Sequence, residues 1–244
     1  MWDNNRVSNI LGATYPIIQA PMAGASTPEL VVSVCNAGGI GSLGAAKLSL
    51  NDLKTQCTII RENTNRPFNV NFFAHPEPEQ NNQKIENMIK LLENFYHQLG
   101  ISPVLKATNP IPTFGKQQLE IILDQNPGIV SFHFGLPKEV YINALKEKKI
   151  KILSTATTII EALDLEKRGA DIVIAQGYEA GGHRGTYMDD AKEQTGSISL
   201  IPQISDAISI PTIAAGGIND GRGIAAAMLL GAEGVQIGTG FLLA

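Results

Sequence analysis

Residues 211–240 read PTIAAGGINDGRGIAAAMLLGAEGVQIGTG, a short apolar run, a glycine turn, an amphipathic stretch and a second short run. The two runs, 212–215 and 234–237, suit buried strands, whereas residues 221–230 place apolar side chains at helical spacing. A strand, a helix and a strand in this order predict two parallel strands joined by a right-handed crossover. The stretch therefore predicts one repeating unit of an α/β fold.

The same alternation extends through the whole chain. The segments expected to be strands are residues 16–20, 40–43, 68–73, 129–134, 150–154, 171–176, 212–215 and 234–237. The segments expected to be helices are residues 26–38, 82–99, 138–148, 158–167, 200–208 and 221–230. Strands that alternate with helices this often predict a (β/α)₈ barrel of the TIM type, with an open doubly wound sheet as the alternative.

Length and composition agree with one barrel domain over residues 1–244. A chain of 244 residues, 43% of them hydrophobic and 17% charged, can bury a large core, and barrels of this type have about 250 residues. One connection, residues 74–128, is much longer than the others. We expect it to carry an insertion that either covers a substrate or adds a packing layer.

Charge and hydropathy exclude several classes of partner. A net charge of −4 offers no basic field to a nucleic acid. No apolar run approaches the roughly 18 residues of a membrane span, and the polar N-terminus lacks a secretory signal. Cys35 and Cys57 form no CxxC motif and are expected to be buried hydrophobes, with a reactive thiol as the alternative. We therefore expect a cytoplasmic protein.

Polar side chains interrupt the third and fourth predicted strands. In the third, Asn69 and Asn71 are expected to face the barrel axis. In the fourth, Ser131 and His133 are expected to point inward and Phe134 outward. An unpaired buried polar group costs about 1–3 kcal/mol, so these groups must bond to one another, to water or to a bound polar ring. His133 is a candidate for contact with a substrate.

A glycine-rich loop follows the sixth predicted strand. The strand ends at Gln176, and residues 177–185 read GYEAGGHRG. Glycines allow the backbone to come close to a flat ligand. His183 lies in this loop, and an imidazole changes its charge near neutral pH. We interpret His183 as a candidate catalytic base, with a structural role as the alternative.

The turns after the last two predicted strands carry further glycines. Gly216 and Gly217 precede the helix predicted at 221–230, and Gly238 and Thr239 follow the eighth strand. In many barrels these two turns bind a phosphate, because bare backbone N–H groups and a helix N-terminus solvate the anion. The pattern therefore predicts a phosphate site at the end of the barrel.

Seven motifs, taken together and in order, resemble the class I nitronate monooxygenases (the 2-nitropropane dioxygenase family). The motifs are QAPMAG (19–24), NAGGIGS (36–42), NVNFF (69–73), SFHFG (131–135), GGHRG (181–185), AAGGI (214–218) and QIGT (236–239). The resemblance covers nearly the whole chain. It implies a (β/α)₈ barrel that binds FMN, contains no metal, and oxidises alkyl nitronates such as propionate 3-nitronate with O₂ to a carbonyl product and nitrite.

The resemblance also implies roles for the matching residues. Pro21 and Met22 would lie against the flavin ring. Asn71 and Gln176 would bond to the ring or the ribityl chain, and His183 would be the base or orient the anion. The residues that would hold the phosphate end of the cofactor are Gly181, Gly182, Gly216, Gly217, Gln236, Ile237, Gly238 and Thr239. The expected partners are a small nitronate or nitroalkane and O₂, with a homodimer as the candidate assembly.

Two alternatives stay open. FMN-dependent enoyl-ACP reductases share the Gly-Gly-His loop and the double-glycine turn, and would use NAD(P)H to reduce an enoyl thioester; the SFHFG motif and Arg184 favour the monooxygenase. The family also continues past the eighth strand with a last helix and a lobe, whereas this sequence ends at Ala244. The alternative of another class is therefore a shortened, inactive barrel that exposes apolar surface on its first and last strands.

Overall fold

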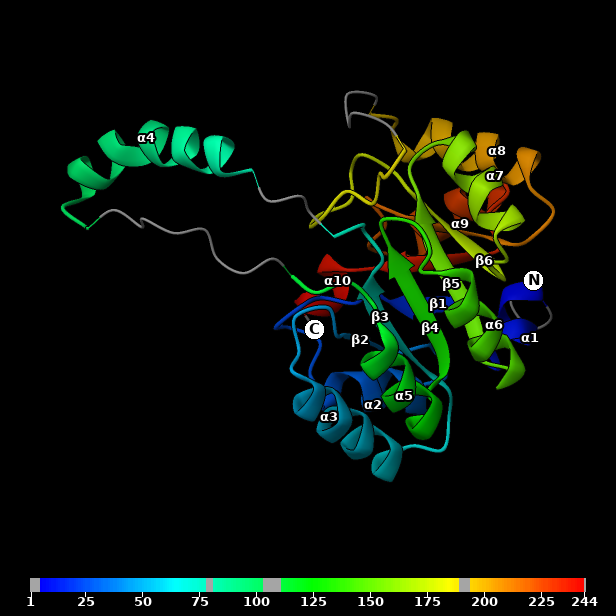
Figure 1. Cartoon of the computed structure of the whole chain (residues 1–244). Helices are drawn as coiled ribbons and strands as arrows, with labels where there is room; N and C mark the ends of the chain where they lie inside the picture. Colours follow the sequence, from blue (N-terminus) through cyan, green and yellow to red (C-terminus); the bar gives the residue numbers. More distant parts are fainter. Residues whose placement is uncertain (1–4, 78–80, 103–110, 189–193, 244) are drawn as a thin grey trace. The chain divides into compact units, whose positions relative to one another are not determined.

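The computed structural model of the chain describes residues 5–77, 81–102, 111–188 and 194–243. The chain divides into two units (Figure 1). One consists of Met1–His75 and Thr113–Ala244, and the other of Pro76–Pro112. All the site residues predicted from the sequence belong to the first unit, and the two units are described separately.

The first unit is a closed barrel of eight parallel strands (Figure 1). The strands are β1 (Ile17–Gln19), β2 (Ser42–Gly44), β3 (Phe68–Phe73), β4 (Gly128–His133), β5 (Lys151–Ala156), β6 (Ile172–Gln176), β7 (Thr212–Ala215) and β8 (Gly234–Ile237). Their order is β1-β8-β7-β6-β5-β4-β3-β2, and a parallel bridge between Ile18 and Ile40 joins the two ends of the sheet. The predicted TIM barrel is confirmed, and the open-sheet alternative is wrong.

A side chain helps to close the seam between β1 and β2. The Gln19 N–H donates to the Ile40 carbonyl at 2.9 Å, and the Ile40 N–H donates to the Ile17 carbonyl at 2.9 Å. The amide oxygen of Gln19 then accepts from the Ser42 N–H at 2.8 Å. Because residue 40 bonds to β1 whereas Ser42 pairs with Asn69 of β3, the strand proper begins at Ser42 and not at residue 40 as predicted.

Helices precede, connect and follow the strands. Among the described residues they are α1 (Arg6–Leu11), α2 (Pro28–Asn36), α3 (Leu50–Asn63), α4 (Asn82–Leu99), α5 (Lys116–Gln125), α6 (Glu139–Glu147), α7 (Ile159–Lys167), α8 (Ser197–Ala207), α9 (Gly221–Leu229) and α10 (Thr239–Leu242). The six predicted helices are present, and α1, α3, α5 and α10 were not predicted. None of the helices in this described part has the combined length and apolar character that crossing a membrane requires.

Two apolar layers stabilise the barrel. The inner layer fills its interior and consists of Val7, Leu11, Ile18, Ile40, Ile129, Leu153, Ile172, Ile174, Ile213 and Ala215. Val7 and Leu11 come from α1, which therefore closes one end of the barrel. The outer layer joins strands to helices and includes Phe68, Val70, Phe72, Val130 and Phe132. These five side chains alternate along β3 and β4 with Asn69, Asn71 and Ser131, which were predicted to face the barrel axis, and burying each contributes about 1.5–3 kcal/mol.

The second unit contains α4. The side-chain oxygen of its cap, Asn81, accepts from the Lys84 N–H at 2.9 Å, and Gly100 ends the helix with φ 66°. None of the residues of α4, all of them described, is buried. The predicted long connection, residues 74–128, therefore holds this unit and also α5, which contacts α3 and α6 as an ordinary barrel helix.

Apolar surface on the last strand is covered. Val235 is fully buried and Ile237 is 7% exposed, and both belong to the outer layer, where α9 contacts β8. On β1, Ile17 is half-buried against the same layer. The predicted exposure of apolar side chains on the outer face of β8 is therefore wrong.

Both cysteines are buried in the outer layer. Burial raises the pKa of the Cys57 thiol to about 12 and also raises the pKa of Cys35. A thiol that stays protonated at neutral pH is a poor nucleophile. The structure therefore favours the packing role for both residues.

Candidate active site

The barrel interior beyond the inner apolar layer is polar. Asn69 Nδ2 donates to the Oγ of Ser42 at 3.0 Å and to the Oγ of Ser131 at 2.9 Å. Asn71 Nδ2 donates to the same Ser131 Oγ at 2.9 Å. All four side chains are buried. The amide nitrogens of both asparagines are therefore satisfied by neighbouring strands, the mutual bonding that the sequence left open.

His133 ends β4 and bonds to two neighbouring elements. Its Nε2 is 2.9 Å from the carbonyl oxygen of His183, and its Nδ1 is 3.1 Å from Oγ1 of Thr155. Because a carbonyl oxygen only accepts, Nε2 carries the proton and Nδ1 accepts from the hydroxyl. Desolvation lowers the pKa of His133 to about 4, which keeps the ring neutral at neutral pH. Both ring nitrogens are thus used within the chain, which gives no support to the predicted substrate contact.

Gln176 ends β6 and bonds to the same loop. Its Nε2 donates to the His183 carbonyl at 2.9 Å, and its Oε1 accepts from the Gly185 N–H at 2.7 Å. The His183 carbonyl therefore accepts two hydrogen bonds, one from His133 and one from Gln176. The sequence predicted that Gln176 bonds to the cofactor, and the structure leaves one of its amide hydrogens for such a contact.

The imidazole of His183 is exposed and lies among aromatic rings. Its centroid is 5.2 Å from that of Phe73 and 6.1 Å from that of Phe134. Phe134 has a φ of 66°, a left-handed conformation that is rare for a bulky side chain. This turn ends β4 at His133 and directs the Phe134 ring toward His183. The predicted outward position of Phe134 in the strand is therefore wrong.

The turns after β6, β7 and β8 lie against one another. A Cβ on Gly216 would come within 2.9 Å of the backbone nitrogen of Ala180, and one on Gly240 would come within 2.8 Å of Oδ1 of Asn219. Gly216 and Gly217 have φ values of 112° and 72°, which glycine adopts without strain. Close approach and backbone conformation both require glycine here.

Several backbone N–H groups in these turns have no acceptor in the described part of the chain. They belong to Gly181, Gly182, Gly216, Gly217, Gly238 and Thr239. Unbonded N–H groups gathered in adjoining turns favour an anion. The turns therefore offer the donors that the predicted phosphate site needs.

The loop after β1 lies beside the turn after β8. A Cβ on Gly238 would lie 3.7 Å from Cβ of Ala20 and 3.9 Å from Sδ of Met22. The Met22 N–H donates to Oγ of Ser26 at 2.8 Å, which fixes this loop. Pro21 and Met22 are both half-buried. The residues predicted to face a flavin ring thus lie close to those predicted to bind its phosphate.

Two buried amide oxygens have no hydrogen-bond partner among the described residues. They are Oδ1 of Asn69 and Oε1 of Gln236. An unpaired buried acceptor costs about 1–3 kcal/mol, which a ligand with N–H or O–H groups would recover. The residues present therefore fit FMN, with donors for a phosphate in the turns and acceptors for a polar ring or ribityl chain in the barrel. Within the described ranges, no His, Cys, Asp or Glu side chains are grouped to hold a metal.

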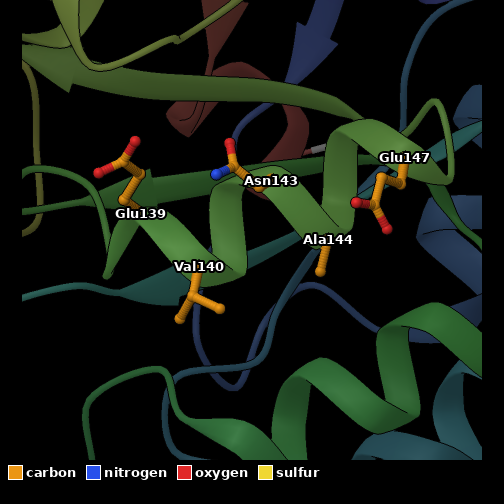
Figure 2. Close-up of a pocket in the computed structure, with 5 residues that line it drawn as sticks. All are labelled: Glu139, Val140, Asn143, Ala144 and Glu147. Carbon is orange, nitrogen blue, oxygen red and sulfur yellow. The ribbon is translucent and has the colours of Figure 1, made fainter.

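Hollows on the described surface of the barrel unit include one on α6 and one beside the loop of His183. The larger, about 450 Å³, is lined by side chains that project from α6 alone: Glu139, Val140, Asn143, Ala144 and Glu147 (Figure 2). The smaller, about 160 Å³, is lined by Gln176, Gly177, Tyr178, Ala180, Gly182, Arg184 and Gln194. The hollow on α6 contains no predicted site residue, whereas the smaller hollow follows the loop that carries His183. The smaller hollow is therefore the one that belongs to the site.

A family model described as nitronate monooxygenase matches residues 4–244. The chain belongs to the nitronate monooxygenase family. This match confirms the resemblance that the seven motifs indicated, and family membership makes the chain an oxidoreductase.

Individual members of the nitronate monooxygenase family are similar over nearly all of this chain. A probable nitronate monooxygenase of Staphylococcus aureus (strain MSSA476) is 44% identical over 245 residues, which are 99% of this chain and 68% of the relative. Another from Staphylococcus saprophyticus is 44% identical over 243 residues, which are 98% of this chain and 68% of that relative. The chain thus spans about two thirds of the length of these family members.

Solved structures show the same barrel. A nitroalkane oxidase from Streptomyces ansochromogenes is 38% identical, with a TM-score of 0.84 over 97% of this chain and 67% of that one. The M276A mutant of FabK from Thermotoga maritima is 32% identical, with a TM-score of 0.76 over 99% of this chain and 66% of that one.

Two contributors to the site were not predicted from the sequence. Thr155 bonds to His133, and Gln19 closes the seam between β1 and β2. Gln19 is a polar residue in an otherwise apolar strand, the same signal that singled out Asn69 and Asn71. Thr155 follows the end of the strand predicted at residues 150–154, so no such signal marked it.

Proposed function

We propose that this family member binds FMN and oxidises alkyl nitronates, such as propionate 3-nitronate, with O₂ to a carbonyl product and nitrite. The observation that carries the proposal is the set of unbonded backbone N–H groups in turns next to the loop of the exposed His183. Membership of the nitronate monooxygenase family supports the reaction class, as does the similarity to a nitroalkane oxidase structure.

The cofactor would be held at both ends. The backbone N–H groups of the 181–182, 216–217 and 238–239 turns would bind the phosphate. Gln236 would accept a hydrogen bond through the Oε1 that lacks a partner in the described chain. Asn71 would use its amide oxygen, because its amide nitrogen already donates to Ser131.

Proton chemistry would belong to His183. When bound, FMN supplies the acceptor for the two electrons that the substrate loses. A neutral His183 would accept the α-proton of a nitroalkane at a ring nitrogen, whereas a protonated His183 would stabilise the anionic nitronate. The neutral ring of His133 adds no charge beside it.

The aromatic rings around His183 would shape the substrate pocket. Phe73 and Phe134 have centroids 5.1 Å apart in an edge-to-face arrangement, next to the imidazole. Such an apolar wall suits an alkyl chain and keeps water from the reacting carbon. This supports small alkyl nitronates as substrates.

The deciding experiment supplies the FMN-loaded protein with propionate 3-nitronate in air and measures nitrite. We expect nitrite release that consumes O₂ and needs no nicotinamide. The matched control is the same protein under nitrogen, in which release should stop. Absence of nitrite from the loaded protein in air would contradict the proposal.

An enoyl-ACP reductase is the second candidate, because the FabK structure is also similar over nearly the whole chain. A second arm of the experiment therefore mixes the FMN-loaded protein with NADPH and an enoyl thioester. NADPH oxidation that depends on the thioester would favour the reductase. If the purified chain takes up no FMN, both the monooxygenase and the reductase are excluded, and the inactive barrel is the remaining alternative.

A further inference from the structure

Glu161 is a fully buried carboxylate that has no part in the proposed chemistry. It lies in the first turn of α7 and is 0% exposed. Between described residues, no Lys or Arg forms an ion pair with it. Burying a carboxylate without a counter-charge is costly unless hydrogen bonds compensate it. Hydrogen-bond donors must therefore compensate the buried carboxylate, and those donors are in turn held in place by it.

Both carboxylate oxygens of Glu161 are saturated with donors. Oε2 accepts from the N–H and the hydroxyl of Thr157, at 2.7 and 2.8 Å. Oε1 accepts from the hydroxyl of Thr186 at 2.9 Å and from the N–H groups of Tyr187 and Met188 at 2.7 and 3.3 Å. Hydrogen bonds to a charged acceptor are about twice as strong as neutral ones. The carboxylate thus ties residues 186–188 to the end of β5.

The segment held by Glu161 directly follows the loop that carries His183. That loop contains three glycines within five residues, and Gly182 has a φ of 74°. Such a backbone has little stiffness of its own. A Cβ on Gly185 would lie 2.7 Å from Cγ2 of Thr155 and 2.8 Å from Cε1 of His133, so the loop lies close against the barrel at that point. The position of His183 therefore depends on anchors on both sides of it.

We propose that Glu161 is a positioning residue for His183: its buried carboxylate holds residues 186–188 and so fixes the imidazole at the barrel mouth. The inference rests on the proposed function, in which His183 handles the proton of the substrate. A catalytic group must be held to within about 0.5 Å, and a displacement of about 1 Å costs roughly 100-fold in rate.

Glu166 provides a matched control on the same helix. Its Oε1 accepts from the N–H groups of Ser209 and Ile210, at 2.8 and 3.2 Å, before the start of β7. It therefore also clamps a backbone segment through a carboxylate, but at the opposite ends of the strands from His183. Glu166→Gln should alter that segment and leave the His183 loop unchanged.

The first measurement is hydrogen exchange of the amides in residues 184–188. In Glu161→Gln, the amide group replaces one acceptor oxygen with an NH₂ that cannot accept from the backbone. We expect these amides to exchange about tenfold faster or more, because bonds to a charged acceptor are lost. In Glu166→Gln the exchange of the same amides should match that of the unmodified chain.

The second measurement compares a neutral nitroalkane with its preformed nitronate, both with FMN-loaded protein. The nitroalkane requires proton removal by His183 and the nitronate does not. We therefore expect Glu161→Gln to lower kcat roughly tenfold to 100-fold for the nitroalkane and much less for the nitronate, whose charge His183 would only stabilise, while changing bound flavin little. A purely structural defect would lower the turnover of both substrates equally and would also lower the flavin content.

Unchanged exchange in 184–188 in Glu161→Gln, or equal loss with both substrates, would overturn the proposal. If Glu161→Gln does not fold, Thr186→Val removes a single donor to Oε1 and should give the same pattern more weakly; no effect there also overturns it. If the unmodified chain releases no nitrite from either substrate, the proposed function fails, and the exchange data still decide whether Glu161 holds the loop.

Discussion

Two hydrogen bonds to the backbone carbonyl of His183 help to position the loop that carries the imidazole. That oxygen accepts from Nε2 of His133 and from Nε2 of Gln176, both at 2.9 Å. The first bond needs a proton on Nε2, and the neutral tautomer that desolvation and the hydroxyl of Thr155 favour carries it there. The protonation site of one half-buried ring is therefore linked to the position of another residue fifty positions away.

The neutral state of His133 predicts a pH dependence of stability. Its pKa in the folded chain is about 4, below the ordinary value near 6.5 of an unfolded histidine. Between these values the unfolded chain binds a proton that the folded chain does not, so the free energy of unfolding falls as pH falls from about 6.5 to about 4. Above pH 6.5 His133 does not change the free energy of unfolding as pH rises.

The test is urea unfolding of the unmodified chain and of His133→Gln at several pH values. The variant should show a shallower loss of unfolding free energy between pH 6.5 and 4, and the same slope above pH 7. Equal slopes in the acidic window would show that His133 does not titrate as described.

His183→Asn should separate flavin binding from proton transfer. The substitution keeps a polar side chain on the exposed loop and leaves the backbone carbonyl with its two donors, so flavin content should be unchanged. Turnover of a neutral nitroalkane should fall about 100-fold or more, because an amide is no base at neutral pH. The measurement is kcat with flavin content checked by absorbance, and full activity would remove His183 from the proposed chemistry.

At the scale of elements, the sequence predicted the strands better than the turns. The bounds of β3, β7 and β8 are those predicted, because alternation and glycine turns mark them clearly. Phe134 was placed in a strand because Phe132 and Phe134 continue the alternating pattern. In the structure Phe134 instead has a left-handed φ of 66°. A phenylalanine does not indicate this conformation, and the glycine that would indicate it lies one residue later, at position 135.

Much of the site was visible in the sequence, but its bonding was not. The glycine turns, the loop of His183 and the inward asparagines were all predicted, because each leaves a local pattern. Whether Gln176 binds a ligand or the chain depends on the backbone returning to it at Gly185, nine residues later. Glu161 gave no signal, because a helix that starts with an acidic residue is ordinary.

Gly41, just before β2, packs so closely on α2 that a larger side chain at this position should cause a steric clash. A Cβ on Gly41 would come within 2.2 Å of the Val31 carbonyl oxygen and 2.7 Å of its Cα, which are backbone atoms that cannot move aside. Gly41→Ala should therefore destabilise the barrel by about 1–3 kcal/mol or more, measured by urea unfolding. Gly115→Ala is the control, since its Cβ would meet nothing closer than 3.5 Å and should have little effect. A stable Gly41→Ala variant would mean that α2 lies farther from β2 than described.

At the scale of the whole molecule, the two units are predicted to be separable. The Phe114 N–H donates to the Phe73 carbonyl at 2.9 Å, so the chain leaves the barrel and returns to it at adjacent points. Replacing residues 77–111 with a short Gly-Ser turn should leave the barrel folded, with an unfolding free energy within about 1 kcal/mol, because a shorter loop costs little to close. Circular dichroism and urea unfolding measure this, and a variant that fails to fold would show that Pro76–Pro112 is part of the barrel core.

The account depends most on an anion site formed by glycine turns, and the affinities of FMN and riboflavin test it most directly. Riboflavin lacks only the phosphate, so the unmodified chain should bind FMN at least about 100-fold more tightly, because hydrogen bonds to a charged group are lost. Equal affinity of the unmodified chain for the two flavins would contradict the account.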